Sequence, residues 1–218
     1  MILTRADASR LEASVNDGGV AILPTDTVYG LCCDPENERA VARLYELKGR
    51  PKTRAAAVMF FTLDRALAAL PELSLDERAA VAALLPGAVT LLLANPAPRF
   101  AAAAAADPRT LGLRVPAWPL ALAALEATRI PVVQSSANLS GGADARRLQE
   151  VPASLRDGAD LVLDGGELPG VPSTVVDLRG LAGARGWRIV RPGAVSERDV
   201  AAALASVGRG LGGTGQAL

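Results

Sequence analysis

The sequence contains no histidine in 218 residues. This absence excludes catalysis by a Cys–His or Ser–His pair, HExxH zinc sites and proton shuttling through imidazole. Lysine is almost as scarce, because only Lys48 and Lys52 occur and arginine supplies every other positive charge. Any chemistry must therefore use lysine, arginine, carboxylates, hydroxyls, amides or a metal ion that arrives with a ligand.

Aromatic residues and net charge are also low. Aromatic side chains make up 3% of the chain, so the core must be built from alanine, valine and leucine. The 23 basic and 23 acidic residues cancel, which argues against a protein that coats nucleic acid through a global basic field. Cys32 and Cys33 are sequence neighbours, a poor geometry for a disulfide, and we expect two buried thiols in a reducing compartment.

The chain shows neither a leader segment nor a membrane span. Its N-terminus mixes acidic and basic residues and has no apolar stretch. The most apolar run, residues 79–94, is too short to cross a bilayer and is interrupted by Pro86-Gly87. These features predict a cytoplasmic protein.

Apolar runs of strand length alternate with helical patterns, which is typical of an α/β domain. The later strands follow one another without helices, so we expect a twisted, mixed sheet of parallel and antiparallel strands with flanking helices. The expected domain covers residues 1–207, and the glycine-rich tail 208–218 is expected to be disordered. Strands are expected at 19–25, 55–61, 88–94, 110–116, 130–136, 159–166, 173–178 and 186–193, and helices at 37–48, 63–70, 76–85, 119–129 and from Ser196.

Polar loops follow several of the expected strands. They are LPTDTVYGL (23–31), KGRPKTR (48–54), VVQSSANLSGG (132–142) and the pair PSTVVDL (172–178) with RIVRPG (188–193). Ligands of α/β sheets favour the carboxyl ends of strands, so these loops are expected to meet at one site. The hydroxyls of the first loop indicate either a self-satisfied turn or a floor of donors for a small polar ligand.

The second loop places four positive charges in seven residues. Cations at the end of a helix compensate its dipole, and this explains one or two of the charges. The interpretation we favour is a phosphate clamp, in which the ammonium of Lys48 and the planar fork of Arg50 make complementary contacts with a polyphosphate.

Taken in order, PTDTVYGL, KGRP, RVP, SSANLSG, STVVDL and RPG closely resemble the YrdC-like threonylcarbamoyl-AMP synthase family, over about residues 10–205. The resemblance implies a twisted mixed sheet around a basic cavity, in the short form that lacks an extra C-terminal domain. It implies an enzyme that condenses L-threonine, bicarbonate and ATP to threonylcarbamoyl-AMP and pyrophosphate. A tRNA threonylcarbamoyltransferase complex would then use the product, in a transient contact, to modify tRNA.

The resemblance also implies roles for individual residues. Catalysis in the phosphate and carbamate region would fall to Lys48, Arg50, Ser136 and Asn138. Threonine would be bound by Thr25, Thr27, Arg114 and Ser173, with Arg114 meeting its carboxylate. The nucleotide would be bound by Arg50, Arg54, Ser136 and Arg191. Mg²⁺ would be held mainly by the ATP phosphates, without a protein metal site.

Four residues depart from the family pattern. Arg54 replaces an asparagine in the second motif, Met59 and Trp118 replace histidines found in relatives, and Gln134 replaces a small residue before the Ser-x-Asn pair. Two other functions therefore remain open: a paralogue that activates another carbamoyl donor, and a double-stranded RNA-binding module. Zero net charge and the lack of interleaved aromatics count against the RNA module, although weak tRNA binding stays possible.

Overall fold

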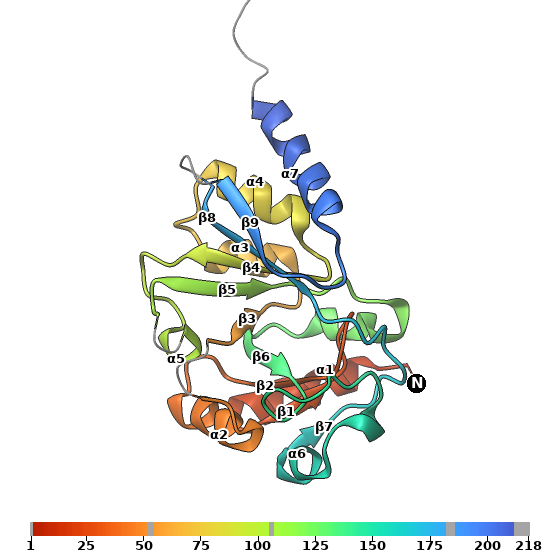
Figure 1. Ribbon diagram of the computed structural model, residues 1–218. Coiled ribbons are helices and arrows are strands. Elements are labelled where there is room, and N and C mark those ends of the chain that lie inside the picture. Colours follow the sequence, from red (N-terminus) through yellow and green to blue (C-terminus); the bar gives the residue numbers. More distant parts are fainter. Residues whose placement is uncertain (1, 52–54, 105–106, 182–185, 212–218) are drawn as a thin grey trace, which may run out of the picture.

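The computed structural model describes residues 2–51, 55–104, 107–181 and 186–211. Within them, nine strands form one sheet in the order β7-β1-β2-β6-β3-β5-β4-β8-β9 (Figure 1). The pairs β1–β7, β3–β5 and β4–β8 are parallel and the others antiparallel, which confirms the mixed sheet. The strands are β1 Ala21–Leu23, β2 Gly30–Cys33, β3 Ala57–Met59, β4 Val89–Ala94, β5 Thr110–Arg114, β6 Val132–Ser136, β7 Leu161–Val162, β8 Thr174–Gly180 and β9 Gly186–Arg191.

Helices flank the sheet and connect its strands (Figure 1). They are α1 Arg5–Asn16, α2 Glu38–Lys48, α3 Leu63–Ala69, α4 Leu75–Leu84, α5 Ala101–Ala104, α6 Ala153–Gly158 and α7 Glu197–Leu211, with 3₁₀ helices η1 Leu120–Ala127 and η2 Leu148–Glu150. Buried alanine, valine and leucine side chains dominate the core, as the scarcity of aromatics predicts. None of the helices in the described part of the chain is long and apolar enough to span a membrane.

Helix α2 positions the cationic loop. The side chain of Asn37 accepts hydrogen bonds from two backbone N–H groups of the first turn and so begins the helix. Gly49 ends it in the left-handed conformation, with φ of 59°, which glycine adopts without a steric penalty. The chain therefore turns sharply between Lys48, which is 2% exposed, and Arg50, which is half-buried.

The structure differs from the expected elements in several places. Residues 23–31 were expected to be a loop, but the last two of them, from Gly30, belong to strand β2. This strand pairs with β1 as an antiparallel hairpin. The sequence did not predict this strand, because all four residues of GLCC are buried and apolar and polar residues do not alternate in it. The segment 119–129 forms a 3₁₀ helix that begins after Pro119 without a side-chain cap. Helix α1 was not predicted.

The boundaries of the last elements also differ from expectation. Only two residues of the segment 159–166 pair as a strand, in β7. Helix α7 continues to Leu211, so four residues of the expected tail 208–218 are helical. Residues 212–218 lie outside the described part of the chain.

Both cysteines are fully buried free thiols on β2, as predicted. Strand β2 lies inside the sheet and pairs with β1 and β6, and both cysteines belong to the hydrophobic core. Burial raises the pKa of Cys33 to about 12, so this thiol does not ionise near neutral pH. A thiol that stays protonated and enclosed is a packing group.

We therefore predict that replacing Cys32→Ser together with Cys33→Ser changes kcat by no more than a few-fold. The buried hydroxyls should lower the free energy of unfolding by roughly 1–3 kcal/mol each, because a hydroxyl is costly to desolvate. Urea unfolding and steady-state kinetics measure the two effects. Loss of turnover in a variant with native circular dichroism would contradict the packing role.

Candidate functional site

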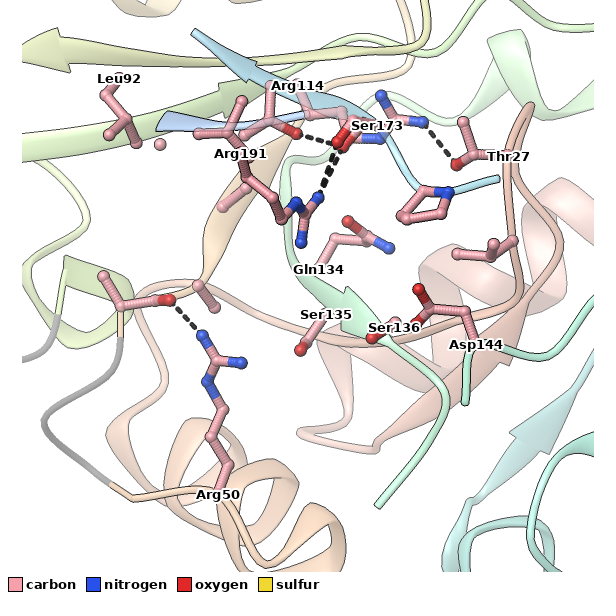
Figure 2. A pocket seen from close by; sticks show the side chains of 18 of the residues that line it. Thr27, Arg50, Leu92, Arg114, Gln134, Ser135, Ser136, Asp144, Ser173 and Arg191 are labelled. Atoms are coloured by element: carbon pink, nitrogen blue, oxygen red, sulfur yellow. Dashed lines mark hydrogen bonds between the residues drawn. The ribbon is translucent and has the colours of Figure 1, made fainter. Parts of the chain in front are cut away.

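The structure brings distant polar loops together around one pocket (Figure 2). Of the residues singled out in the sequence, Thr27, Arg50, Arg114, Ser136, Ser173 and Arg191 line this pocket. They come from the loop after β1, the end of α2, strand β5, strand β6 and the pair β8 and β9. Thr25, Lys48 and Asn138 lie behind the lining, and Lys52 and Arg54 are outside the described residues.

Arg114 is the most enclosed cation of the pocket, with a side chain that is 2% exposed. Its Nη1 donates to the carbonyl oxygens of Gly87 and Val89 at 3.2 and 3.1 Å. Its Nη2 forms an ion pair with Asp26 and donates to Oγ1 of Thr27 at 2.9 Å. The terminal N–H groups are thus engaged, and a ligand carboxylate would have to displace one of these acceptors.

Asp26 was not singled out in the sequence, because an aspartate in a turn is unremarkable there. In the structure its side chain is 7% exposed, and besides Arg114 it accepts a hydrogen bond from the backbone N–H of Ala117 at 2.9 Å. Burial lowers the pKa of Arg114, while the carboxylate of Asp26 opposes that shift. Asp26 therefore holds the guanidinium in place and joins the first loop to the segment after β5.

The two threonines of the first loop are not a floor of donors. Oγ1 of Thr25 donates to the carbonyl of Val28 at 2.7 Å, which uses its single hydrogen. The 3.0 Å contact between the hydroxyls of Thr25 and Thr27 must then be a bond donated by Thr27. Since Thr27 also accepts from Arg114, only acceptor capacity remains toward the pocket. The hydroxyl of Thr25 is instead satisfied by hydrogen bonds within its own turn, which is the other possibility that the sequence left open.

Lys48 is buried behind the loop that follows β6, rather than beside Arg50 in the pocket. Its ammonium donates to the carbonyl of Asn138 at 2.9 Å and also contacts the carbonyl of Ser136 and Oδ1 of Asn138. Oγ of Ser136 donates to the same Oδ1 at 2.8 Å. Lys48 therefore fixes the Ser-x-Asn loop from behind, so the two cations of the expected clamp act from different directions.

Arg50 is the cation of the KGR motif that faces the pocket. Its guanidinium lies 5.7 Å from the ring centroid of Tyr45 and donates to the carbonyl of Ala55 (Figure 2). On the opposite wall, Nη2 of Arg191 donates to the carbonyl of Ser173 at 2.8 Å. Oγ of Ser173 is 2.8 Å from Oγ1 of Thr90, another lining residue that sequence reasoning missed.

Asp144 is the acidic member of the pocket lining in the described residues. It accepts a hydrogen bond from Nδ2 of Asn138 at 3.2 Å. Within the described chain, no three His, Cys, Asp or Glu side chains gather closely enough to hold a metal ion. Among the described residues, the pocket lining thus has one carboxylate beside three arginines and several hydroxyls.

Two of the departures from the family pattern lie outside the pocket lining. Trp118 stacks on Phe61 with ring centroids 5.6 Å apart, and its indole N–H donates to the carbonyl of Phe61 at 2.9 Å. Met59 is fully buried on β3. Both side chains serve packing, whereas Gln134 lines the pocket.

The family model Sua5_yciO_yrdC, described as "Telomere recombination", matches residues 13–193. This chain belongs to the Sua5/YciO/YrdC family. A threonylcarbamoyl-AMP synthase from Xanthomonas campestris pv. campestris is 35% identical over 79% of this chain and 94% of its own length.

Several solved structures share the fold of this chain. Pyrococcus abyssi Sua5 matches as an H234A/Y235A variant with a TM-score of 0.79 and 25% identity, over 91% of this chain and 60% of that protein. The same protein complexed with L-threonine matches with a TM-score of 0.77 and 24% identity, over 93% and 58%. Full-length HypF in a phosphate- and nucleotide-bound form matches with a TM-score of 0.69 and 23% identity, over 86% and 29%. This chain thus spans about three-fifths of the Pyrococcus protein.

The burial of Lys48 leads to a prediction for this member of the family. Burial lowers the pKa of Lys48 to about 8, with the charge of Arg50 lowering it further and Asp144 opposing the shift. Lys48 and Lys52 are the two lysines of the chain, so ¹⁵N-lysine labelling gives two side-chain signals. We expect the Lys48 signal to titrate near pH 8, and Lys52→Arg should leave it in place.

The same shift determines how Lys48 affects stability. Between pH 8 and the ordinary lysine value of about 10.5, the unfolded chain binds this proton and the folded protein does not. The contribution of Lys48 to the free energy of unfolding therefore rises with pH across that window. A Lys48 signal that titrates above pH 10 would contradict the buried environment seen here.

Proposed function

We propose that this chain is an L-threonylcarbamoyladenylate synthase, a nucleotidyltransferase that forms threonylcarbamoyl-AMP and pyrophosphate from L-threonine, bicarbonate and ATP. The observation that supports this most is a single pocket with arginine and hydroxyl groups on facing walls, Arg50 with Ser136 and Arg191 with Ser173. Such a pocket suits a reaction between two anionic substrates. The Xanthomonas relative, at 35% identity, bears the name of this activity.

The proposed reaction has two steps. The neutral amine of threonine and bicarbonate give a carbamate and water. An oxygen of the carbamate then forms a bond with the α-phosphorus of ATP, while the bond from that phosphorus to the bridging oxygen breaks and pyrophosphate leaves with the electron pair. The nucleophile is already an anion, so the second step needs no strong general base, which suits a chain without histidine.

We assign the phosphate side of the pocket to Arg50 and to Ser136, whose hydroxyl would turn from Oδ1 of Asn138 to donate to the phosphate. Asn138 and Lys48 position this side from behind, since Lys48 holds the carbonyls of the loop and Asn138 accepts from Ser136. Three anions, the threonine carboxylate, the carbamate and the triphosphate, repel one another in water. Fixed cations in a partly dehydrated pocket remove this repulsion without reorganising during the reaction.

We assign the opposite side to the amino acid and the nucleoside. Thr27 offers an acceptor to the hydroxyl or amine of threonine, while Thr25 only orients Thr27. Arg114 attracts the threonine carboxylate and Ser173 contacts it, with Arg191 on the nucleotide side. Arg54 is assigned to the nucleotide by sequence alone, because it is outside the described residues.

Mg²⁺ would arrive bound to ATP and neutralise part of the triphosphate charge, with the carboxylate of Asp144 as the one pocket ligand. The product is a reactive mixed anhydride, so we propose a transient contact with a cytoplasmic tRNA threonylcarbamoyltransferase complex. We do not expect this protein to bind RNA tightly, since its net charge is zero.

A second candidate is an enzyme that activates a different carbamoyl donor, such as carbamoyl phosphate. It is favoured by the likeness in fold to HypF, which holds phosphate and nucleotide in its structure. Both candidates need the same phosphate-binding side and differ in the amino-acid side. Dependence on threonine therefore separates them.

The direct test is pyrophosphate release from ATP with each substrate omitted in turn. We expect release only when ATP, bicarbonate and L-threonine are all present with Mg²⁺, and mass spectrometry should find threonylcarbamoyl-AMP. Equal release with L-serine or without an amino acid would contradict the threonine-specific function. Turnover of carbamoyl phosphate in its place would support the second candidate.

Arg114→Ala tests the amino-acid side of the pocket. We predict that the KM for threonine rises roughly tenfold or more, while the KM for ATP changes less than about threefold, because the lost charge acts on the carboxylate. Asp26 is left without its partner, so the double variant Asp26→Asn with Arg114→Ala separates kinetic from folding effects. Arg129→Ala, at an exposed arginine, is the control. A selective effect on ATP would show that Arg114 serves the nucleotide.

A further inference from the structure

The pocket contains a carboxamide that forms no side-chain hydrogen bond to the described residues. Gln134, on β6, lines the pocket and is 9% exposed, yet its side chain makes no hydrogen bond to any described residue. Its amide nitrogen and oxygen are not among the enclosed, unpaired side-chain atoms of the described residues, so they are open to the pocket. An amide that lines a pocket and hydrogen-bonds to no described residue is available to hydrogen-bond a ligand.

The sheet fixes where this amide lies. Gln134 pairs with Cys32 of β2 and with Ala57 of β3, so its backbone belongs to the middle of the sheet. A Cβ atom on Gly30, in β2, would lie 2.6 Å from Nε2 of Gln134. Glycine at position 30 therefore leaves the space in which the amide lies, and the group is held by strands rather than by a mobile loop.

Gln134 lies between the two polar walls of the pocket. Figure 2 shows its amide in the middle of the cavity, with Arg191 and Ser173 on one side and Ser135, Ser136 and Asp144 on the other. Two anionic substrates held by these walls must be joined in the space between them. A neutral group with both a donor and an acceptor occupies that space.

We propose that Gln134 binds the carbamate through which the two substrates are joined, an inference that rests on the proposed function. A carbamate is planar and presents an N–H group beside an oxygen, and a carboxamide presents a carbonyl beside an NH₂ group. The Gln134 carbonyl accepts from the carbamate N–H, and its NH₂ donates to one carbamate oxygen. The other oxygen is left to attack the α-phosphorus.

A neutral amide suits this position better than another cation. A guanidinium bound to the carbamate would stabilise its negative charge strongly and make the oxygen a poorer nucleophile. The amide orients the carbamate plane while leaving most of the charge on the attacking oxygen. It thus contributes positioning, the effect by which a bound pair of reactants gains most in rate.

The test compares Gln134→Met, which keeps the length of the side chain but has no N–H or carbonyl, with Gln149→Met on the exposed helix η2. We expect Gln134→Met to lower kcat about 10- to 100-fold while the KM values for threonine and ATP change less than about threefold, because the amide contacts the carbamate and neither the threonine carboxylate nor the triphosphate. Gln134→Glu should be slower still at neutral pH, since it loses both N–H donors and adds negative charge. Gln149→Met should match the wild type.

Thermal unfolding separates a role in binding from a role in stability, because loss of a structural side chain would lower the Tm. Because the amide hydrogen-bonds to no described residue, its removal should leave the Tm of Gln134→Met unchanged or higher. A lower Tm for Gln134→Met, or a kcat within threefold of the wild type, would overturn the inference. The proposed function would still stand in that case, provided that the wild-type protein releases pyrophosphate in the presence of threonine. If the wild type shows no threonine-dependent pyrophosphate release, the proposed function fails and the carbamate assignment fails with it.

Discussion

The buried ion pair between Arg114 and Asp26 is the constraint on which the pocket depends. A buried arginine is destabilising unless its charge and its N–H groups are satisfied, and here the acceptors come from two separate segments. Asp26 and Thr27 belong to the β1–β2 hairpin, whereas Gly87 and Val89 precede or begin β4. Satisfying one side chain on β5 therefore fixes these segments relative to one another, and the floor of the pocket is formed before any ligand binds.

Lys48 does the same for the other side of the pocket. Its ammonium is enclosed by oxygens of Ser136 and Asn138, so the loop after β6 cannot move without exposing or unpairing a buried charge. Two buried cations thus hold the framework, and two less buried ones, Arg50 and Arg191, face the cavity. Four of the 23 basic residues of a chain without net charge thus surround one pocket.

The mixed sheet and the meeting of the polar loops could be predicted, because buried strands are continuous apolar runs and polar residues follow them. The direction of individual groups could not. Lys48 and Arg50 are two residues apart in one cationic motif, yet the left-handed turn at Gly49 sends one behind the lining and the other into it. Thr25 and Thr27 both looked like donors, and only the hydrogen bonds to Val28 and Arg114 show that their hydrogens or acceptors are used internally. The roles of Asp26 and Gln134 follow only from the residues that surround them in the structure.

We propose that one pocket holds both substrates, with the triphosphate on the wall of Arg50 and Ser136 and the amino acid on the wall of Thr27 and Ser173. A crystal structure with L-threonine, bicarbonate and a non-hydrolysable ATP analogue tests this most directly. We expect both ligands in the pocket, with the α-phosphorus and the threonine nitrogen on either side of Gln134. A triphosphate bound outside this pocket, or threonine bound at a separate site, would contradict it.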